Sequence, residues 1–251
     1  MLAYQQTAQL PVIAAGTEAT EIIRVGLEAA PGPVALACSF SMEDVVIIDL
    51  LQRVAPQVRV FAIDTGRLPE ETHEVAEALV ERYGIEIDWY FPDRNEVEKL
   101  LRNEGSFSFR SSLEARQTCC RIRKLEPLQR ALAGLDGWLT GLRRAQSDNR
   151  QNISALEIDE VNGGLLKINP LIEWNDSQLE DYVQQHRLPV NRLYHAGYTS
   201  IGCAPCTRAI APGEHSRAGR WWWESAEHKE CGLHRRPDKA IPVHTTTKEG
   251  H

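Results

Sequence analysis

The sequence has no run of about 18 apolar residues, the length that a helix needs to cross a bilayer. Residues 1–16 also lack the basic segment and continuous apolar core of a signal peptide. Positive charge is scarce as well, because 35 acidic and 28 basic residues leave a net charge of -7, which disfavours broad electrostatic binding of nucleic acid. These absences predict a soluble, cytoplasmic protein with neither a membrane nor a nucleic acid as its partner.

Two common nucleotide-binding motifs are missing too. Neither G-x-x-x-x-G-K-[ST] nor G-x-G-x-x-G occurs, which excludes a Walker A loop and a dinucleotide fingerprint. No internal repeat, low-complexity tract or linker divides the 251 residues. Apolar periodicity fades after about residue 200, where glycine, proline and charged residues become frequent. We therefore expect an α/β unit over residues 1–215 and a C-terminal segment, 216–251, that belongs to the same functional unit.

Short apolar runs alternate with segments of helical periodicity. The runs that predict strands lie at 34–38, 58–63, 86–91 and 137–142. Helices are predicted at 42–54, 69–83, 119–132 and from a capping Asp176 to about residue 186, and Asn162-Gly163 predicts a hairpin between 156–161 and 165–169. Strands that alternate with helices of this length predict βαβ units, hence a mostly parallel sheet flanked by helices.

Six cysteines stand out in a chain with no export signal, where disulfides are disfavoured. Cys119 and Cys120 are adjacent, and Cys203 and Cys206 form a C-x-x-C. Four thiolates can hold an iron–sulfur cluster or a tetrahedral zinc ion, and the adjacent pair favours a cluster because it offers separate ligand positions. Zinc, or simple packing of small apolar side chains, remains an alternative. Cys38 ends an apolar run and is expected to be inert packing.

Cys231 lies in a different setting, the sequence Glu-Cys-Gly-Leu-His at 230–234 in a charged tail. Nearby lysine, arginine and histidine side chains favour the thiolate, which is the nucleophilic form of cysteine. The alternative is an incidental surface cysteine. We interpret Cys231 as a candidate nucleophile.

Polar loops follow the first two predicted strands. Ser39, Phe40 and Ser41 follow the first, and Asp64-Thr65-Gly66 follows the second. The carboxyl ends of parallel strands and the helix N-termini beside them are common anion sites, although a helix cap and an ordinary turn explain these residues equally simply.

Arginines and tryptophans supply further candidates. Arg143 and Arg144 follow a predicted strand, whereas Arg217 and Arg220 lie between the C-x-x-C and Cys231. Guanidinium groups bind phosphate and sulfate in a bidentate manner, but most surface arginines are merely solvated. The tryptophans at 221–223 cannot all face one core, so at least one contacts a ligand, a partner or another loop, unless all three pin the tail.

Together these residues resemble the assimilatory sulfonucleotide reductases, and among them the bacterial reductases of adenosine 5′-phosphosulfate (APS). The resemblance runs from about residue 34 to residue 234, and its most specific part is Cys-Cys, Cys-x-x-Cys and the later Glu-Cys-Gly-Leu-His. Ser39-Phe40-Ser41 stands where related ATP-dependent ligases have S-G-G, and Ile63-Asp64-Thr65-Gly66 matches an L-D-T-G loop. The fold implied is that of adenine-nucleotide alpha-hydrolase-like proteins, with a modified pyrophosphatase loop.

The resemblance also implies an activity and a set of site residues. The activity is thioredoxin-dependent reduction of APS to sulfite and AMP through an S-sulfocysteine, in sulfate assimilation and cysteine biosynthesis. Thioredoxin would be a separate protein, and the chain could assemble into a homo-oligomer. Cys119, Cys120, Cys203 and Cys206 would hold one [4Fe–4S] cluster per chain, and Cys231 would be the nucleophile. The residues around the substrate would be Lys124, Arg143, Arg144, Arg217, Arg220 and His234, with the loops at 39–41 and 64–66.

Three other functions compete with this interpretation. A reductase of 3′-phospho-APS (PAPS), or one that accepts both substrates, has the same fold and tail cysteine but generally lacks the four other cysteines. An ATP-using ligase or tRNA-thiolating enzyme is disfavoured by the missing S-G-G. A metal-containing regulator that binds nucleic acid is disfavoured by the charge of -7 and by the lack of a recognition motif.

Overall fold

The computed structural model describes residues 10–146 and 150–225, and within them six strands form one sheet. The strand order is β3-β2-β1-β4-β6-β5, with every neighbouring pair parallel except β5 and β6. The strands are β1 (Val34–Cys38), β2 (Arg59–Ile63), β3 (Ile87–Tyr90), β4 (Gly137–Leu139), β5 (Leu156–Asp159) and β6 (Leu165–Ile168). The predicted α/β fold with a mostly parallel sheet is confirmed.

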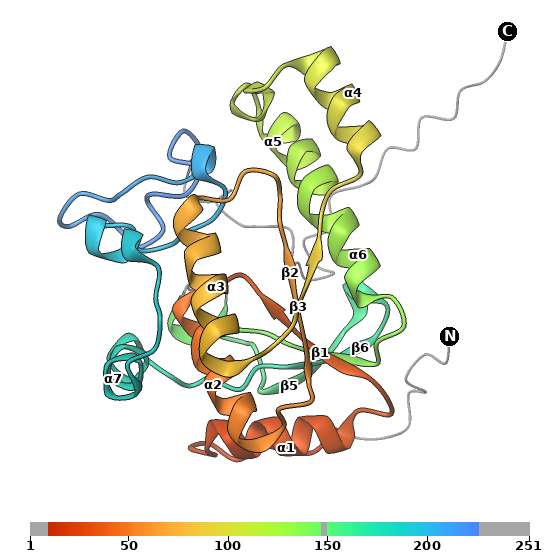
Figure 1. Ribbon diagram of the computed structural model, residues 1–251, viewed down its shortest axis with the longest axis vertical. Coiled ribbons are helices and arrows are strands. Elements are labelled where there is room, and N and C mark those ends of the chain that lie inside the picture. Colours follow the sequence, from red (N-terminus) through yellow and green to blue (C-terminus); the bar gives the residue numbers. More distant parts are fainter. Residues whose placement is uncertain (1–9, 147–149, 226–251) are drawn as a thin grey trace, which may run out of the picture.

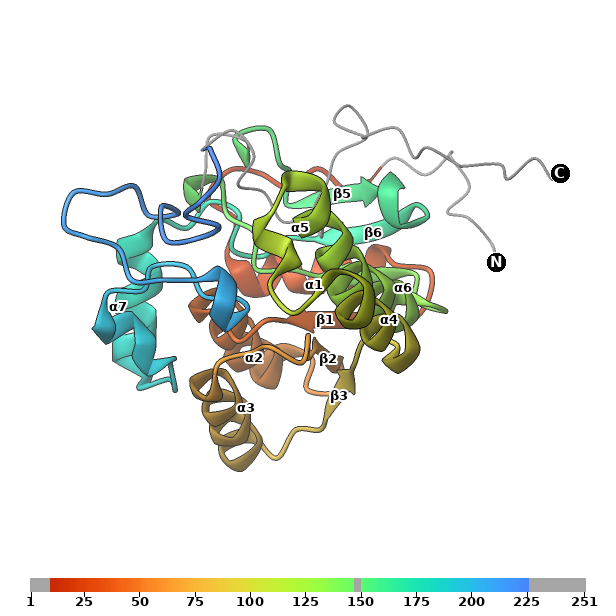
Figure 2. The same ribbon diagram turned by 90° about the horizontal axis from the view of Figure 1, so that it is seen from above.

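Helices cover both faces of the sheet (Figure 1). In Figure 1, α3 and α7 lie to the left of the strands and α4, α5 and α6 to the right, while α1 lies below. The helices are α1 (Ala19–Ala29), α2 (Met42–Val54), α3 (Glu70–Tyr83), α4 (Arg94–Glu104), α5 (Leu113–Cys120), α6 (Glu126–Leu132) and α7 (Asp176–His186). Figure 2 shows the segment that follows α7, in blue, running back toward α5.

The central strand β1 is buried on both faces. Leu36 packs into the larger hydrophobic cluster with α1 and α2, and Ala35 packs into a second cluster with Leu128 and Trp138. Successive side chains of a strand point to opposite faces. Because Ala35 and Leu36 are both fully buried, both faces of β1 are covered. This double burial explains why β1 reads as an unbroken apolar run rather than an alternating one.

Local capping explains where the helices differ from the sequence predictions. The helix expected at 119–132 begins earlier, because the Ser112 side chain accepts a hydrogen bond from the Ala115 N–H and caps α5. It is then interrupted by a π-helical turn, Arg121–Leu125, before α6. The prediction that Asp176 caps α7 is wrong by one residue, because Asn175 is the cap and forms a capping box with Gln178. Helices α1 and α4 were not predicted from the sequence.

The remaining predictions concern the hairpin, the boundary and the membrane. The hairpin is confirmed, although Glu160–Asn162 forms a 3₁₀ turn and both Gly163 and Gly164 adopt positive φ. The boundary between 215 and 216 stays a prediction, and the bridge between Thr207 and Arg220 joins residues on its two sides. No helix within residues 10–146 and 150–225 is long and apolar enough to cross a membrane.

Asp49 joins three helices. This carboxylate on α2 accepts hydrogen bonds of 2.7 Å from the Tyr83 hydroxyl on α3 and 2.7 Å from the Tyr182 hydroxyl on α7, and it pairs with Arg53 at 2.6 Å. Burial raises its pKa, but the two tyrosine hydrogen bonds and the charge of Arg53 outweigh burial and lower the pKa overall.

We predict that Asp49→Ala lowers the free energy of unfolding at pH 7 by about 1–2 kcal/mol, because two hydroxyl groups lose their acceptor. Since the pKa of Asp49 is lower in the folded state, its contribution is present above pH about 4 and is lost as the pH falls below that value. Urea unfolding at pH 7 and at pH 3 measures both effects. Asp88→Asn, which breaks an exposed pair with Arg59, is the control and should leave stability unchanged within error. Equal stability of Asp49→Ala and the wild type at pH 7 would contradict the prediction.

Candidate active site

A cavity of about 530 Å³ opens at the carboxyl ends of β1, β2 and β4. Its walls are the loops that follow these strands, together with parts of the segment from 198 to 220. The chain first connects β1 to β2 on one side and later returns to place β4 on the other side of β1. In open parallel sheets, ligands bind in the crevice at such a reversal of strand order, which makes this cavity the candidate active site.

The loop after β1 is held in shape by its own polar groups. The backbone N–H and hydroxyl of Ser39 donate to the Asp44 carboxylate at 2.6 and 2.7 Å, and the Ser41 hydroxyl caps α2 by accepting from the Asp44 N–H. Phe40 is buried with a φ of 62°, a left-handed conformation that is rare outside glycine, and stacks on Trp89. All three predicted loop residues line the cavity.

The titratable side chain of Asp44 also lines this cavity. Burial raises its pKa to about 6, although the hydrogen bonds from Ser39 act in the opposite direction. The neighbouring carboxylate of Glu43 raises the pKa further. The first turn of α2 therefore carries, at the wall of the cavity, a carboxyl group with a pKa of about 6.

The loop after β2 contributes Thr65 to the cavity, whereas Asp64 and Gly66 are not among its lining residues. Thr65 Oγ1 lies 3.2 Å from Cys203 Sγ, so this loop contacts the C-x-x-C segment. The Asp64 carboxylate accepts from the Gly66 N–H at 2.7 Å, which closes the turn. At a φ of 68°, Gly66 leaves room for Arg123, whose guanidinium donates to the Thr65 carbonyl at 2.7 Å.

The four predicted metal ligands line one small cavity between α5 and the C-x-x-C segment. Cys119, Cys203 and Cys206 are buried there beside Phe109 and Trp221, and Cys120 is partly exposed. The other cysteine of the described residues, Cys38, is buried and does not line this cavity. In the parts of the chain that the structure describes, no three His, Cys, Asp or Glu side chains are arranged to hold a single metal ion.

Burial makes two of these thiols, those of Cys119 and Cys206, poor acids. It raises the pKa of Cys119, against the lowering effect of Arg123 and Arg67, and it raises the pKa of Cys206 to about 12, against the lowering effect of Lys124. Buried thiols with raised pKa values stay protonated unless a bound metal stabilises their thiolates. Four cysteines around one space, with cations beside them, fit the ligand set of an anionic iron–sulfur cluster.

The π-helical turn aims consecutive residues inward. Ile122, Arg123 and Lys124 are all buried, and π turns of this kind occur frequently at functional sites. Lys124 and Cys203 line both the small cysteine cavity and the large cavity. The two cavities therefore adjoin at these two residues.

Three of the four predicted arginines line the large cavity, and the fourth does not. Arg217 and Arg220 line the large cavity, and Arg220 is buried beside Gly202. Arg143 also lines the cavity, but its guanidinium donates to protein acceptors, as described below. Arg144 is not a lining residue, because its guanidinium donates to the Ile153 carbonyl and pairs with Glu173.

A buried ion pair fastens the end of the described chain to α5. The Arg116 guanidinium makes two hydrogen bonds of 2.9 Å to the Glu224 carboxylate, and their side chains are only 2% and 8% exposed. Arg116 and Arg220 both lie over the Trp221 ring, at 4.6 and 4.7 Å from its centroid. Trp223 packs on Phe109, which is the contact with another loop that we expected of at least one of the three tryptophans.

Comparison with known proteins agrees with this architecture. Residues 33–209 match the family described as the phosphoadenosine phosphosulfate reductase domain. The chain belongs to this family. An adenosine 5′-phosphosulfate reductase of Allochromatium vinosum is 49% identical over 203 residues, which cover 81% of this chain and 79% of that protein. Another, of Burkholderia cepacia, is 40% identical over 245 residues, which cover 98% of both chains.

Solved structures confirm the fold. The phosphoadenylyl-sulfate reductase of Candida auris matches 78% of this chain and 91% of its own, with a TM-score of 0.66 and 26% identity. The FMN adenylyltransferase of Candida glabrata matches with a TM-score of 0.52 at 15% identity, covering 93% and 82%. Both the predicted family and the predicted adenine-nucleotide alpha-hydrolase-like fold are confirmed.

Some site residues lie outside the predictions, and others outside the described chain. Glu43, Gln146 and Asp176 line the cavity of this reductase-family protein but were not predicted from the sequence. In the sequence these residues are recognisable only by their position, just after a strand or at the start of a helix. Many solvent-exposed polar residues occupy such positions, so position alone does not identify a site residue. Cys231 and His234 lie outside the described residues, so their roles stay predictions.

We predict that Glu224→Gln and Arg116→Met each lower the free energy of unfolding by about 3–5 kcal/mol, because each leaves one charge buried without its partner. The double variant Arg116→Met/Glu224→Leu should lose less than either single variant, since no lone charge remains. Urea unfolding of anaerobically purified protein measures the three values. Glu98→Gln, at an exposed pair with Arg94, serves as the control. A double variant that loses the sum of the two single losses would show that the pair is not coupled.

Proposed function

We propose that this protein is an APS reductase that uses thioredoxin to release sulfite and AMP. The observation that carries the proposal is the junction of the two cavities at Lys124 and Cys203. There a cavity lined by cationic side chains adjoins four cysteines, and relatives of the chain are named as APS reductases; both observations support the proposal. A role in sulfate assimilation and cysteine biosynthesis in the cytoplasm belongs to the same proposal.

The cationic side chains would bind the phosphosulfate. Lys124, Arg217 and Arg220 line the cavity next to Cys203, where they would neutralise the two anionic groups of APS. Negative charge grows on the phosphate oxygen as its bond to sulfur breaks, so cations held in place lower the barrier for departure of AMP. His234 would add a further donor from the C-terminal segment.

Cys231 would be the nucleophile. Its thiolate attacks the sulfur of APS, a sulfur–sulfur bond forms, and the sulfur–oxygen bond breaks with its electron pair going to AMP. A thioredoxin thiolate then attacks the Cys231 sulfur and expels sulfite, which leaves with the electron pair of the sulfur–sulfur bond. The second thioredoxin thiol resolves the mixed disulfide and restores the Cys231 thiolate. The two electrons thus come from the thioredoxin dithiol.

Cys119, Cys120, Cys203 and Cys206 would hold the [4Fe–4S] cluster. When bound, the cluster would supply a covalent link between α5 and the C-x-x-C segment and a fixed charge near the phosphosulfate, without any need to change oxidation state. The chain's own contribution is to keep Lys124 and Cys203 at the junction of the two cavities.

We predict that wild-type protein given APS without a reductant gains the mass of one SO₃ on Cys231, and that thioredoxin then discharges it as sulfite. Cys231→Ser should lose turnover because it lacks the nucleophile, yet it should bind APS and retain iron. Intact mass, peptide mapping and sulfite assay measure these outcomes. An adduct on another cysteine, or turnover by Cys231→Ser, would refute the mechanism while leaving the substrate open.

We also predict about four iron and four labile sulfides per chain in anaerobically purified protein. Cys119→Ser, Cys120→Ser, Cys203→Ser and Cys206→Ser should each lose iron and activity together. Cys38→Ala is the matched control for iron content, because Cys38 is buried but does not line the cysteine cavity. Stoichiometric zinc without sulfide would overturn the cluster assignment.

A further inference from the structure

Two groups of charged side chains line the large cavity, over different strands of the sheet. In the cationic group, Lys124 and Arg220 lie beside the Cys203 segment, and Arg217 lines the same cavity; Cys203 contacts Thr65 at the end of β2. A second group comes from the segments after β4 and β6, on the other side of β1, and from the first turn of α2, which follows β1. Since neighbouring strands lie about 4.8 Å apart, β2 and β4 are about 10 Å apart at the base of the cavity.

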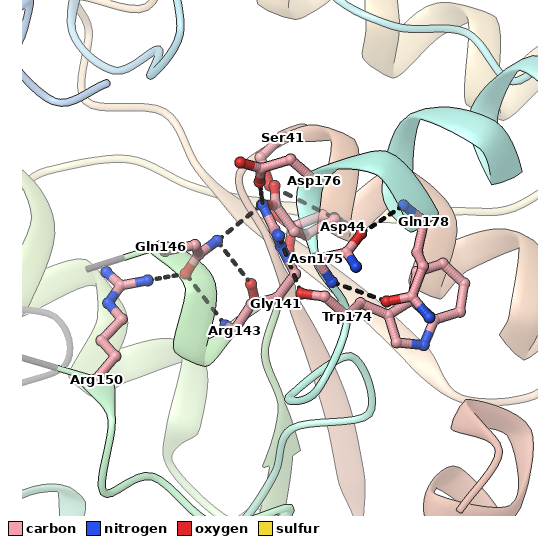
Figure 3. Close-up of polar contacts among 11 residues, drawn as sticks. Ser41, Asp44, Gly141, Arg143, Gln146, Arg150, Trp174, Asn175, Asp176 and Gln178 are labelled. Carbon is pink, nitrogen blue, oxygen red and sulfur yellow. Dashed lines mark hydrogen bonds and ion pairs between the residues drawn. The ribbon is translucent and has the colours of Figure 1, made fainter. Parts of the chain in front are cut away.

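Arg143 is the centre of the second group (Figure 3). Its Nε and Nη2 donate to Glu43 Oε1 at 3.0 and 2.8 Å, and Nη2 also donates to Asp176 Oδ1 at 2.8 Å. Its Nη1 donates to the Trp174 carbonyl at 3.1 Å. The guanidinium therefore directs donors from all three of its nitrogens to acceptors within the protein.

Gln146 extends this network. Its amide nitrogen donates to Glu43 Oε1 at 2.8 Å, and its Oε1 accepts from the Arg150 guanidinium. Arg143 and Glu43 are almost fully buried, with side chains 5% and 10% exposed. The second group is thus a connected set of side chains rather than a collection of independent surface charges.

The second group carries more negative than positive charge. Four carboxylates line this part of the cavity together with two guanidinium groups, and the lining residues concerned are Glu43, Asp44, Asp176, Glu180, Arg143 and Arg150. Arg143 is already neutralised by two of these carboxylates, so a phosphate placed here would meet carboxylate oxygens. A hydroxyl group placed here would instead find hydrogen-bond acceptors.

We propose that the Glu43–Arg143–Asp176 network determines nucleotide specificity, by accepting the hydroxyl groups of an unmodified ribose and repelling a phosphate on that ribose. The inference rests on the proposed function in one respect: the cationic group must bind the phosphosulfate, which directs the nucleoside toward β4. Arg143 then acts as a positioning residue that holds two carboxylates in place, and not as a ligand of the phosphosulfate.

Two product analogues test this inference without turnover. AMP and adenosine 3′,5′-bisphosphate differ only by the 3′-phosphate, and isothermal titration of the anaerobically purified holoenzyme gives the dissociation constant of each. We expect the bisphosphate to bind the wild type at least about ten-fold more weakly than AMP, since a phosphate within several ångströms of carboxylates is repelled by more than 1 kcal/mol.

Glu43→Gln removes one charge with little change in shape and releases part of the Arg143 guanidinium. It should reduce the ratio of the bisphosphate dissociation constant to the AMP dissociation constant by about ten-fold, chiefly because the bisphosphate binds more tightly. Asp176→Asn, whose side chain is 75% exposed, should narrow the ratio in the same direction and is expected to fold even if Glu43→Gln does not. Glu173→Gln is the matched control. Glu173 pairs with Arg144, the residue that follows Arg143, but it does not line the cavity, so this variant should leave the ratio unchanged.

Each outcome decides the inference. Equal binding of the two analogues by the wild type overturns it, and so does an unchanged ratio in both Glu43→Gln and Asp176→Asn. An equal loss of affinity for both analogues would make the network a ribose anchor without selectivity, which also overturns it. Sulfite release from APS by the wild type is measured separately, so a failure of the proposed function is distinguishable from a failure of the specificity network.

Discussion

The parallel pairing of β1 on both of its edges is the constraint on which the site depends. Leu36 is in register with Val60 of β2 on one side and with Leu139 of β4 on the other. Parallel strands in register end at the same edge of the sheet, so three loops from distant parts of the chain meet there. The cavity opens at that shared edge, where the left-handed Phe40 and the contact between Thr65 and Cys203 both lie.

Within the cavity, arginine side chains have unequal roles that depend on their partners. Arg143 lines the cavity, but its guanidinium donates hydrogen bonds to Glu43, Asp176 and a carbonyl group. Arg220 lies against Trp221 beside the cysteine segment. An arginine that is charged and near a substrate is therefore not necessarily a substrate ligand, because a buried guanidinium needs internal acceptors for its N–H groups before any N–H remains to donate to a ligand.

The sequence was sufficient for features that depend on local chemistry. The apolar runs, the Ser41 cap and the adjacent cysteines are each visible within a few residues, and the strands and cysteine cavity appear where these signals place them. Arg143 and Arg144 could not be distinguished, because only the fold decides which one meets Glu43. The ion pair between Arg116 and Glu224 escaped prediction for the same reason, since the two residues are far apart in the chain. The π turn interrupts a periodicity that reads as one helix.

Three of the four cysteines that line the small cavity belong to a small core of their own. Cys119, Cys203 and Cys206 cluster with Phe109 and Trp221, and this cluster shares no buried residue with the two clusters that enclose the sheet. None of the four cysteines lies in a strand. Substitutions in this small core can therefore change the set of cysteines without altering the packing of the sheet. The architecture lets the cysteine-lined core vary independently of the fold.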